Sequence, residues 1–383
     1  MKMKFWQKCI LIFCISICLI VLQGCSNKAR TTDIKCKVII DDISDSNIVA
    51  TLLYDDIKFR NSRTYLWENK KITASNDKYK KTFANKYPVS SEIKLIKQLK
   101  LDKLLSDTYG QLIYYANTVE YELFLYEAYD SFDWKIYFLY ENDVKEITIK
   151  NDEDRNIYTY QITEDAVYVH SSKIYKINKK DYTIEILEVP FDEFEVDSAA
   201  AELGGVFIDN DNYIKATSEY KIKSSGNNQI TQNENGGVIL RYNFKTKSAE
   251  TFFETDYIEK IFPLDDGYLV LACEKDTYKP CLKYYDKNFK LSESKYIEIE
   301  SEYGKVSNFF CGSFFSLYDG KLYGVMRVDG KKINEIVVID IQTAKVVYQL
   351  EFINSMASKE GFGLMDAAFH LRKNGKLIDL SLY

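Results

Sequence analysis

Histidine is scarce in this chain of 383 residues, which contains only two. A serine–histidine–aspartate triad or a two-histidine metal site would need His170 and His370 to converge from distant segments. The chain also has no C-x-x-C pair, no G-x-x-x-x-G-K-[ST] or G-x-S-x-G motif and no H-E-x-x-H motif. The sequence therefore predicts no catalytic residue, no metal ligand and no cofactor.

Charge of one sign is not concentrated anywhere, because lysines and acidic residues are interspersed along the chain. The net charge is −6, from 51 basic and 57 acidic residues. Without the first 24 residues, which hold three lysines and no acid, 48 basic residues face 57 acidic ones, and the net charge becomes −9. This acidic balance disfavours nucleic acid and anionic lipid as partners.

Carboxylates are so numerous that a pair of them carries no specific signal for a glycosidase. The run Asp209–Asn212 resembles half of a calcium loop, but Ile214 and Tyr220 occupy the sixth and twelfth positions, where glycine and glutamate are needed. The run predicts a polar hairpin turn.

Cysteine is sparse beyond the first 24 residues, which hold three of the eight. The others are Cys25, Cys36, Cys273, Cys281 and Cys311. Cys273 and Cys281 flank a short turn-like stretch, Glu274–Pro280, and outside the cytoplasm they could form a cross-strand disulfide. The alternative is that both are small buried apolar side chains.

The N-terminus combines a basic start with a short apolar run. Lys2, Lys4 and Lys8 precede 14 residues, Cys9 to Leu22, that are apolar apart from one serine. Fourteen helical residues rise about 21 Å, less than the roughly 30 Å core of a bilayer. The length fits a secretory signal peptide better than a transmembrane anchor, which is the alternative.

The segment Leu22–Cys25, Leu-Gln-Gly-Cys, resembles the lipobox of bacterial lipoprotein signal peptides. The resemblance implies that the Cys25 thiol receives a diacylglyceryl group, that cleavage occurs just before Cys25, and that acyl chains such as palmitate anchor the protein. We expect a signal peptide over 1–24, a tether over 25–35 and an extracytoplasmic domain over 36–383 at the cell membrane.

The body of the chain reads as many short strands. Alternating or continuous apolar segments, such as Ala166–Val169, Tyr268–Leu271 and Glu335–Ile339, are bounded by clusters of Asp, Asn, Gly and Lys. The 31 tyrosines also favour strands. The sequence predicts an all-β protein.

The strands form a repeated unit: a strand centred on tyrosine, a second strand ending in Asp or Asn, and a third strand. The central tyrosines are Tyr168, Tyr213, Tyr268 and Tyr323, spaced by 45, 55 and 55 residues. Such a period, with four strands per unit, is typical of β-propeller blades. We expect a β-propeller of six to seven four-stranded blades, with tandem β-sandwiches as the alternative.

The segment Ile336–Val347 resembles the strand–turn–strand of YVTN- or PQQ-type propeller repeats. Those repeats carry a Thr-Gly-Lys turn, and Ala344 replaces the glycine here. The other copies keep only the apolar pattern and the Asp or Asn, so no narrower family is indicated.

Aromatic residues offer one hint of a ligand, because exposed tyrosine and tryptophan stack on sugar rings. The densest cluster is Trp67, Trp134, Tyr126, Tyr129 and Phe132. At strand periodicity most of these rings should instead lie in the blade core. The sequence favours a non-enzymatic binding or scaffold protein of the cell envelope, with a protein or glycan ligand. A glycan-processing enzyme and an accessory lipoprotein of a transporter or sensor remain as alternatives.

Overall fold

The computed structural model describes residues 35–43, 48–56, 61–68, 71–75, 110–128, 131, 133–150, 157, 159–171, 173–190, 205–225, 227–277, 279–299, 315–328, 333–353, 362–373, 376–377 and 379–381. The chain divides between Ile34 and Lys35 into two compact units, and all of these residues belong to the second. The expected signal peptide and lipobox lie outside the described residues. The described part contains 27 β-strands and no helix, which confirms the all-β class.

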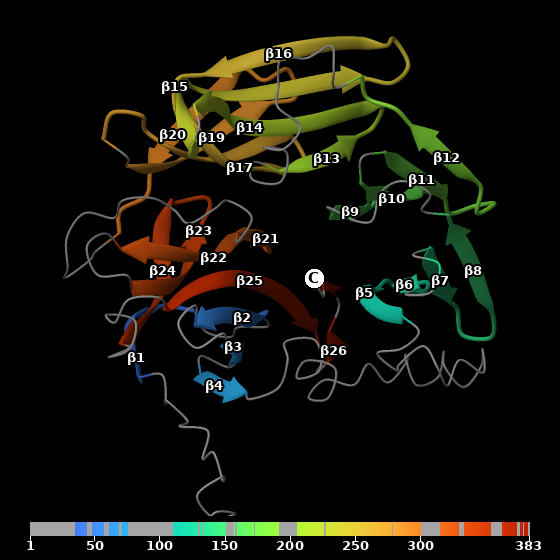
Figure 1. Cartoon of the computed structure of the whole chain (residues 1–383), viewed down its shortest axis with the longest axis horizontal. Coiled ribbons are helices and arrows are strands. Elements are labelled where there is room, and N and C mark those ends of the chain that lie inside the picture. Colours follow the sequence, from blue (N-terminus) through green and yellow to red (C-terminus); the bar gives the residue numbers. More distant parts are fainter. Residues whose placement is uncertain are drawn as a thin grey trace, which may run out of the picture. The chain divides into compact units, whose positions relative to one another are not determined.

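The strands form six antiparallel sheets, here called blades 1 to 6 (Figure 1). Blade 1 contains, in spatial order, β26 (Lys376–Leu377), β25 (Phe362–Lys373), β2 (Ile48–Asp56), β3 (Asn61–Glu68) and β4 (Lys71–Ser75). Blade 2 contains β27 (Asp379–Ser381), β5 (Gly110–Asn117), β6 (Glu122–Ala128), β7 (Trp134–Leu139) and β8 (Val144–Ile149). Blade 3 contains β9 (Thr159–Ile162), β10 (Ala166–His170), β11 (Ile174–Asn178) and β12 (Ile184–Leu187). Blade 4 contains β13 (Val206–Asp209), β14 (Asn212–Ser225), β15 (Asn227–Asn243) and β16 (Ser248–Glu254). Blade 5 contains β17 (Tyr257–Pro263), β18 (Gly267–Cys273), β19 (Pro280–Asp286) and β20 (Leu291–Tyr296). Blade 6 contains β21 (Ser316–Tyr318), β22 (Lys321–Val328), β23 (Ile333–Asp340), β24 (Lys345–Ile353) and β1 (Lys35–Asp41).

Each blade packs against the next one in sequence. Separate hydrophobic clusters join blades 2 and 3, 3 and 4, 4 and 5, and 5 and 6. Trp67 of blade 1 packs against Tyr348 of blade 6 with ring centroids 5.6 Å apart, and β25 of blade 1 contacts β27 of blade 2. This closed order of sheets defines a β-propeller. The predicted fold class is confirmed, and the alternative of paired sandwiches is not observed among the described strands.

Both ends of the described chain contribute to closing this order. β25, near the C-terminus, pairs with β2 along nine residues of β2, from Ile48 to Asp56. β27 pairs with β5, and β1 pairs with β24. Backbone hydrogen bonds between distant parts of the chain therefore hold blades 1, 2 and 6 together.

The four repeat tyrosines occupy one structural position. They lie on the second strand of blades 3, 4, 5 and 6, and each is at most 7% exposed: Tyr168, Tyr213, Tyr268 and Tyr323. The predicted repeat thus marks the strand that is sandwiched between neighbouring blades. The fourth strands β12, β16 and β20 are mostly exposed, because only one edge of each is paired.

The Asp or Asn at the end of each third strand shapes the turn that follows it. Its side-chain oxygen accepts a hydrogen bond from a backbone N–H two or three residues later, in Asn178, Asn243, Asp286 and Asp340. A residue with φ between 54° and 60° then completes the turn: Tyr182, Lys247, Phe289 and Ala344. The repeat therefore has a geometric basis at both its tyrosine and its turn.

Candidate functional site

The run that resembles half of a calcium loop forms the turn between β13 and β14. Asp209 pairs with Asn212 across a two-residue turn, and Asn210 has a φ of 55°. The predicted hairpin turn is confirmed. The Asp209 carboxylate accepts a hydrogen bond from the Tyr268 hydroxyl at 2.6 Å and pairs with the Lys287 ammonium at 3.1 Å. Asp209 thus connects blade 4 to blade 5.

Asp209, Arg241, Tyr268, Lys287 and Phe289 make up what we call the blade 4–5 cluster. Tyr268 stacks on Phe289 with ring centroids 4.5 Å apart, and the Lys287 Nζ lies 4.8 Å from the Tyr268 ring. Arg241 covers the Phe289 ring at 5.6 Å and donates a hydrogen bond to the Lys287 carbonyl at 3.0 Å. Burial and the hydrogen bond to Asp209 raise the pKa of Tyr268, so its hydroxyl stays protonated and donates. These hydrogen bonds, the ion pair and the ring contacts hold blades 4 and 5 together.

A second polar group lies along the same blade interface, around Lys283 on β19. Its Nζ is 2.5 Å from a Glu254 oxygen and 2.9 Å from an Asp256 oxygen, and Tyr285 donates a hydrogen bond to Glu254. Burial lowers the pKa of Lys283, but the hydrogen bonds to Glu254 and Asp256 outweigh it, so the pKa is raised overall. The ammonium therefore stays charged and links β19 of blade 5 to Glu254 at the end of blade 4 and to Asp256 just before β17.

His170 is buried at the end of β10, with only 3% of its surface exposed. Neither ring nitrogen has a hydrogen-bond partner among the described residues. Burial lowers the pKa of His170 to about 4, so the ring is neutral near pH 7. His370 lies on β25 in blade 1, whereas His170 belongs to blade 3. The two histidines therefore belong to blades that are not consecutive.

The two cysteines considered for a disulfide are both free and buried. Cys273 pairs with Pro280 and Cys281 pairs with Ala272, so the cysteines are one residue out of register. Cys273 packs in the cluster between blades 5 and 6, and Cys281 packs in the cluster between blades 4 and 5. Their side chains point to opposite faces of the sheet. In the structure both cysteines thus occupy positions of buried apolar side chains, the alternative to the cross-strand disulfide.

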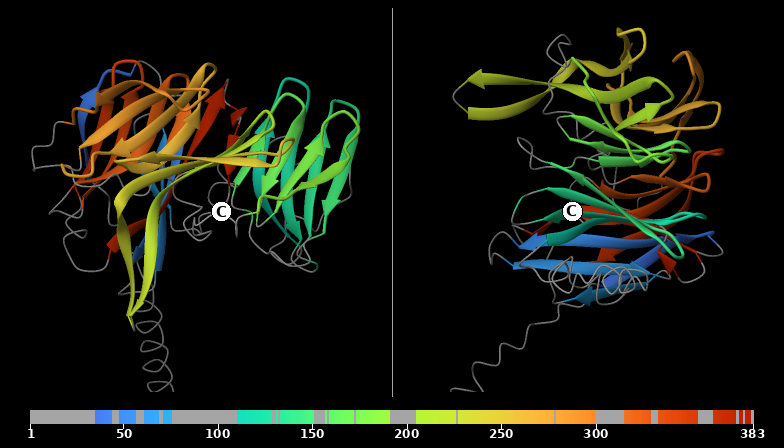
Figure 2. Two further views of the ribbon diagram at one scale, coloured as in Figure 1. Left: turned by 90° about the horizontal axis from the view of Figure 1, so that it is seen from above. Right: turned by 90° about the vertical axis from the view of Figure 1, so that its right-hand side faces the viewer.

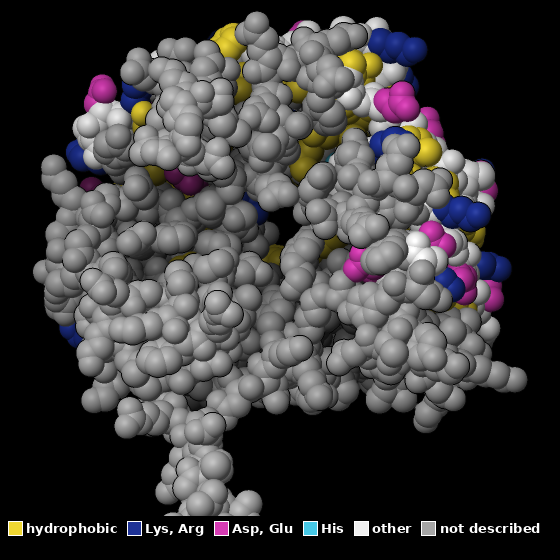
Figure 3. All heavy atoms as spheres, in the orientation of Figure 1, with side chains coloured by type: hydrophobic (Ala, Val, Ile, Leu, Met, Phe, Trp, Pro, Cys, Tyr) yellow, Lys and Arg dark blue, Asp and Glu magenta, His cyan; other side chains and the backbone are white. Residues whose placement is uncertain are grey.

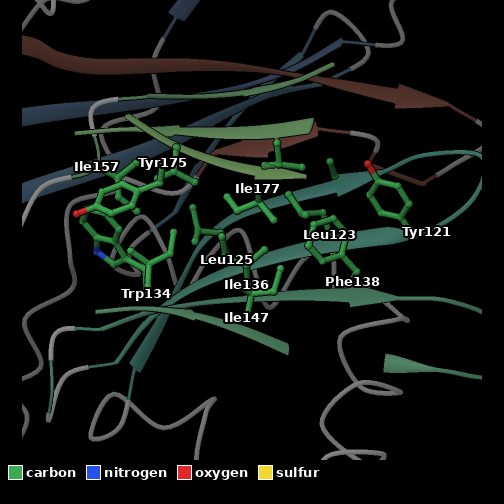
Figure 4. Packing of buried hydrophobic residues seen from close by; sticks show 14 residues of the cluster. Tyr121, Leu123, Leu125, Trp134, Ile136, Phe138, Ile147, Ile157, Tyr175 and Ile177 are labelled. Atoms are coloured by element: carbon green, nitrogen blue, oxygen red, sulfur yellow. The ribbon is translucent and has the colours of Figure 1, made fainter. Parts of the chain in front are cut away.

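The aromatic cluster considered for sugar stacking is core where the structure describes it. Trp67, Trp134 and Tyr126 are at most 1% exposed. Figure 4 shows Trp134 beside Tyr175 within the cluster between blades 2 and 3, with ring centroids 5.7 Å apart. The side chains of Tyr129 and Phe132 lie outside the described residues. Rings at these positions stabilise blade packing and present no face to a sugar.

Gln161 on β9 has a role that its sequence position does not reveal. Because Asp209 and Asn212 close a two-residue turn, the N–H and C=O of Ile208 point away from β14. The Gln161 side chain accepts from the Ile208 N–H at 2.6 Å and donates to its carbonyl at 2.7 Å. Gln161 thus hydrogen-bonds backbone groups at the unpaired edge of β13 in the next blade. Only the tertiary contact reveals this role.

Two further lysines of blade 5 donate hydrogen bonds to backbone carbonyls in or just before blade 6. Lys260 on β17 reaches the Phe315 carbonyl at 2.8 Å, and burial lowers its pKa to about 8. Lys295 on β20 reaches the Gln342 carbonyl at 2.8 Å. On the surface, Figure 3 shows basic and acidic side chains interspersed with one another over the described strands. Among the described residues, no group of three or more His, Cys, Asp or Glu side chains could hold a metal ion. The same residues include no helix with the length and apolar character needed to cross a membrane.

Comparisons with known proteins give only distant likenesses. No family model matches the chain, and no curated protein matches it. TolB from Acinetobacter baumannii is similar over 85% of this chain and 67% of its own, with 9% identity and a TM-score of 0.37. BamB from Moraxella catarrhalis is similar over 61% of this chain and 62% of its own, with 10% identity and a TM-score of 0.33. A mutant of Synechocystis apocarotenoid oxygenase is similar over 84% of this chain and 72% of its own, with 9% identity and a TM-score of 0.42. At these values the fold assignment rests on the sheet order alone.

Proposed function

We propose that this chain is a lipid-anchored binding or scaffold protein at the extracytoplasmic face of a bacterial cell membrane. The observation that carries the proposal is Leu22–Cys25, a lipobox-like segment directly after a basic start and a short apolar run. Two or three acyl chains on Cys25 would anchor the protein stably. The ligand class we propose is a protein or an envelope glycan.

The described blades support a role in presenting a surface. Asp209, Lys283 and Gln161 connect neighbouring blades through hydrogen bonds and ion pairs, and His170 is buried. These groups are occupied within the propeller, so a partner would meet the loops and exposed outer strands.

We also propose that the repeats are of the YVTN or PQQ type. The turn after β23 supports this assignment, since Asp340 accepts hydrogen bonds from the backbone N–H and hydroxyl of Thr343. Ala344 follows with a φ of 55°, at the position where those repeats carry glycine.

The anchor is tested by Cys25→Ala in cells, followed by membrane fractionation and mass spectrometry of the N-terminal peptide. The wild-type peptide should begin at an acylated Cys25, and the variant should leave the membrane fraction or accumulate as a precursor. Unchanged membrane retention of an unprocessed variant would show that the apolar run is a transmembrane anchor.

The ligand is tested by crosslinking the lipidated protein in its own membrane, with capture and mass spectrometry, beside a glycan array. A reproducible crosslinked protein supports the scaffold role. Binding to an array glycan with no crosslinked protein would replace the scaffold role by glycan binding.

A further inference from the structure

The outer edge of blade 4 is long and regular. β16 is the last strand of this blade, and β15 is its only partner among the described strands. The two strands pair without a shift in register, from Gly237 opposite Glu254 to Asn243 opposite Ser248. β16 lies on the outside of the blade in Figure 1, and the left view of Figure 2 looks onto that side. The far edge of β16 therefore offers a straight row of backbone groups to another strand.

The outer strands of the neighbouring blades are protected in ways that β16 is not. Short length, lysine side chains and bulges all discourage pairing at a sheet edge. β12 has only four residues, β8 and β20 carry a lysine, and β1 has a register shift between Val38 and Ile40. β16 has seven residues, Ser-Ala-Glu-Thr-Phe-Phe-Glu, without lysine, proline or a bulge. Its Phe253 is 79% exposed, so an apolar side chain also awaits cover at this edge.

The turn into β16 determines which of its backbone groups point outward. In blade 3 the Asn178 N–H donates to the Thr183 carbonyl at 3.0 Å, so Thr183 faces the preceding strand. The β15–β16 turn has the same length and the same left-handed residue, here Lys247, just before the strand. Ser248 therefore faces β15, and the direction of the backbone groups alternates after it. The residues whose N–H and C=O point outward are Ala249, Thr251 and Phe253.

β16 begins at a basic turn and ends at an acidic stretch. Lys245 and Lys247 are exposed in the turn before the strand. Glu254 is the last residue of the strand, and Asp256 follows two residues later. An antiparallel copy of the same strand would place each basic start beside the acidic end of the other. A uniformly basic or acidic strand would instead meet like charge at one end, so the charges favour a second copy of this chain.

One register of two antiparallel β16 strands satisfies both the backbone and the charges. If Thr251 lies opposite Thr251 of the second copy, all seven residues pair and outward groups meet outward groups. Glu250 then lies opposite Phe252, and Glu254 lies opposite Ser248. Centring on Glu250 or on Phe252 would instead place two glutamates directly opposite each other, which is destabilising.

We propose that two copies of this protein associate edge to edge through antiparallel pairing of their β16 strands, centred on Thr251. The sheet of blade 4 then continues from one copy into the other. The exposed ring of Phe253 lies against Ala249 of the second copy. The two glutamates of the strand bring no uncompensated charge to this edge, because Glu250 pairs with Arg241 and Glu254 with Lys283 within each copy. The association does not depend on the proposed lipid anchor.

Cysteine crosslinking of the full chain in the membranes of expressing cells tests the pairing. After oxidation with copper phenanthroline, Thr251→Cys should give a disulfide-linked dimer on a non-reducing gel. Directly opposite residues have Cα atoms about 5.5 Å apart, within the range that a disulfide spans. Ser248→Cys, on the same strand, should give none, since its two copies would lie about 20 Å apart. The unsubstituted protein supplies the background from the native cysteines.

The register is tested with two differently tagged copies. Ala249→Cys in one copy and Phe253→Cys in the other should crosslink to each other, because these positions lie opposite in the proposed pairing. Ala249→Cys alone should not crosslink to itself, since its copies would lie about 13 Å apart.

A proline variant tests the backbone hydrogen bonds in the same tagged pair. Thr251→Pro removes an outward N–H from each copy, which an edge strand tolerates. It should lower the ratio of paired to unpaired protein by roughly thirty-fold, whereas Thr251→Val should leave it unchanged. A thermal melt checks that the proline variant is folded, and the cysteine variants decide the matter if it is not.

Three results would overturn the inference. These are equal crosslinking of Thr251→Cys and Ser248→Cys, undiminished crosslinking in a folded Thr251→Pro variant, and a Thr251→Cys crosslink to a different protein. The last result would assign the β16 edge to another partner. Because none of these readouts requires an acylated Cys25, their failure would leave the proposed anchor standing.

Discussion

Four turns in blades 3 to 6 place a non-glycine residue in the left-handed region, with φ between 54° and 60°. For an L-amino acid this conformation costs about 1–2 kcal/mol. The Asp or Asn that begins each turn offsets part of this cost by accepting backbone N–H groups. Each turn therefore carries a small strain that glycine would relieve.

Lys247 is the cleanest place to measure this strain, because it is exposed and has a φ of 54°. Lys247→Gly should raise the free energy of unfolding by roughly 0.5–1 kcal/mol, the relieved strain less the added entropy of the unfolded chain. Lys245→Gly, in the same turn without a positive φ, should lower it by a comparable amount or leave it unchanged. Urea unfolding measures both. A lower stability for Lys247→Gly would contradict the strain argument.

His170 ties stability to pH through its burial. Its pKa falls from 6.5 to about 4 on folding, so between these values the unfolded chain binds the extra proton. Stability is therefore complete above pH 6.5 and is lost as the pH falls toward 4, by a maximum of roughly 3 kcal/mol.

The expected result is that His170→Leu flattens the dependence of unfolding free energy on pH between 4 and 6.5. Urea titrations at several pH values would measure the slope. The comparison with His370→Leu isolates the contribution of the only other histidine. A slope that His170→Leu does not change would mean that the ring is protonated in the folded state.

Beyond Ser218 and Gly237, β14 and β15 continue as a two-stranded ribbon past an irregularity in their register, which shows how one bulge redirects a pair of strands. A Cβ at Gly236 would collide with the Glu254 and Thr255 carbonyls and one at Gly237 with the Ile258 side chain, so β15 packs closely on the end of β16 and the start of β17. The ladder then continues past the edge of the blade, which ordinary hairpin connections of a few residues do not do. The close packing of Gly236 and Gly237 therefore fixes the position at which the ribbon leaves blade 4.

Two glycines with positive φ distinguish the cost of backbone strain from the cost of a steric collision when glycine is replaced by alanine. Gly320 has a φ of 68° and open space around it, so Gly320→Ala should cost about 1–2 kcal/mol. Gly236→Ala adds a collision with two backbone carbonyl oxygens and should cost clearly more. Chemical denaturation compares the two variants. Similar losses would indicate that the ribbon root is looser than the structure shows.

The ring is closed by strands from the two ends of the chain, and the two ends differ in importance. β1 is a fifth, outer strand on blade 6, which keeps four strands without it. Blade 1 needs β25 to reach four strands, since only β2, β3 and β4 remain without the C-terminal segment, whereas blade 2 keeps four strands without β27. Blade 1 therefore depends most on the C-terminal segment, because β2 would lose an edge paired along nine residues, while β5 of blade 2 would lose an edge paired along three.

Deleting Lys35–Asp41 should lower the melting temperature but leave a cooperative unfolding transition. Ending the chain after Ile353 removes β25 to β27 and should abolish the cooperative transition, since an opened propeller exposes the faces of its terminal blades. Circular dichroism melts and limited proteolysis distinguish the two outcomes. A cooperative melt for the C-terminal truncation would contradict closure through blades 1 and 2.

Much of the repeat was predictable from local patterns. Tyrosines such as Tyr168 and Tyr268 recur at a period that suits a four-stranded blade, and they lie where the repeat predicts. The run Asp209–Asn212 forms the turn that its polar residues favour. Short strands and turns depend on nearby residues, so a linear pattern is enough to predict them.

The register and the partners were not predictable in this way. Cys273 and Cys281 are one residue out of register, which places them on opposite faces of the sheet. A disulfide between them would need the two residues to be directly opposite each other. Trp67 and Trp134 could be placed on a sugar-binding surface or in the core, and packing against another blade decides the matter. Gln161 gives no local signal, since its partner is a strand edge 47 residues away.

The amino-acid sequence by itself determined that this protein is built of short strands in a repeat of about 50 residues, because alternation and turn residues act over a few positions. It also contains the lipobox-like segment Leu22–Cys25, on which the proposed export and lipid attachment rest. The tertiary structure alone decided that six sheets close in order, that strands from both chain ends share blades, and that Asp209, Gln161 and Lys283 serve as fasteners between them. Those outcomes depend on contacts between residues far apart in the chain, and the physical reason is that each blade buries its faces only against its neighbours.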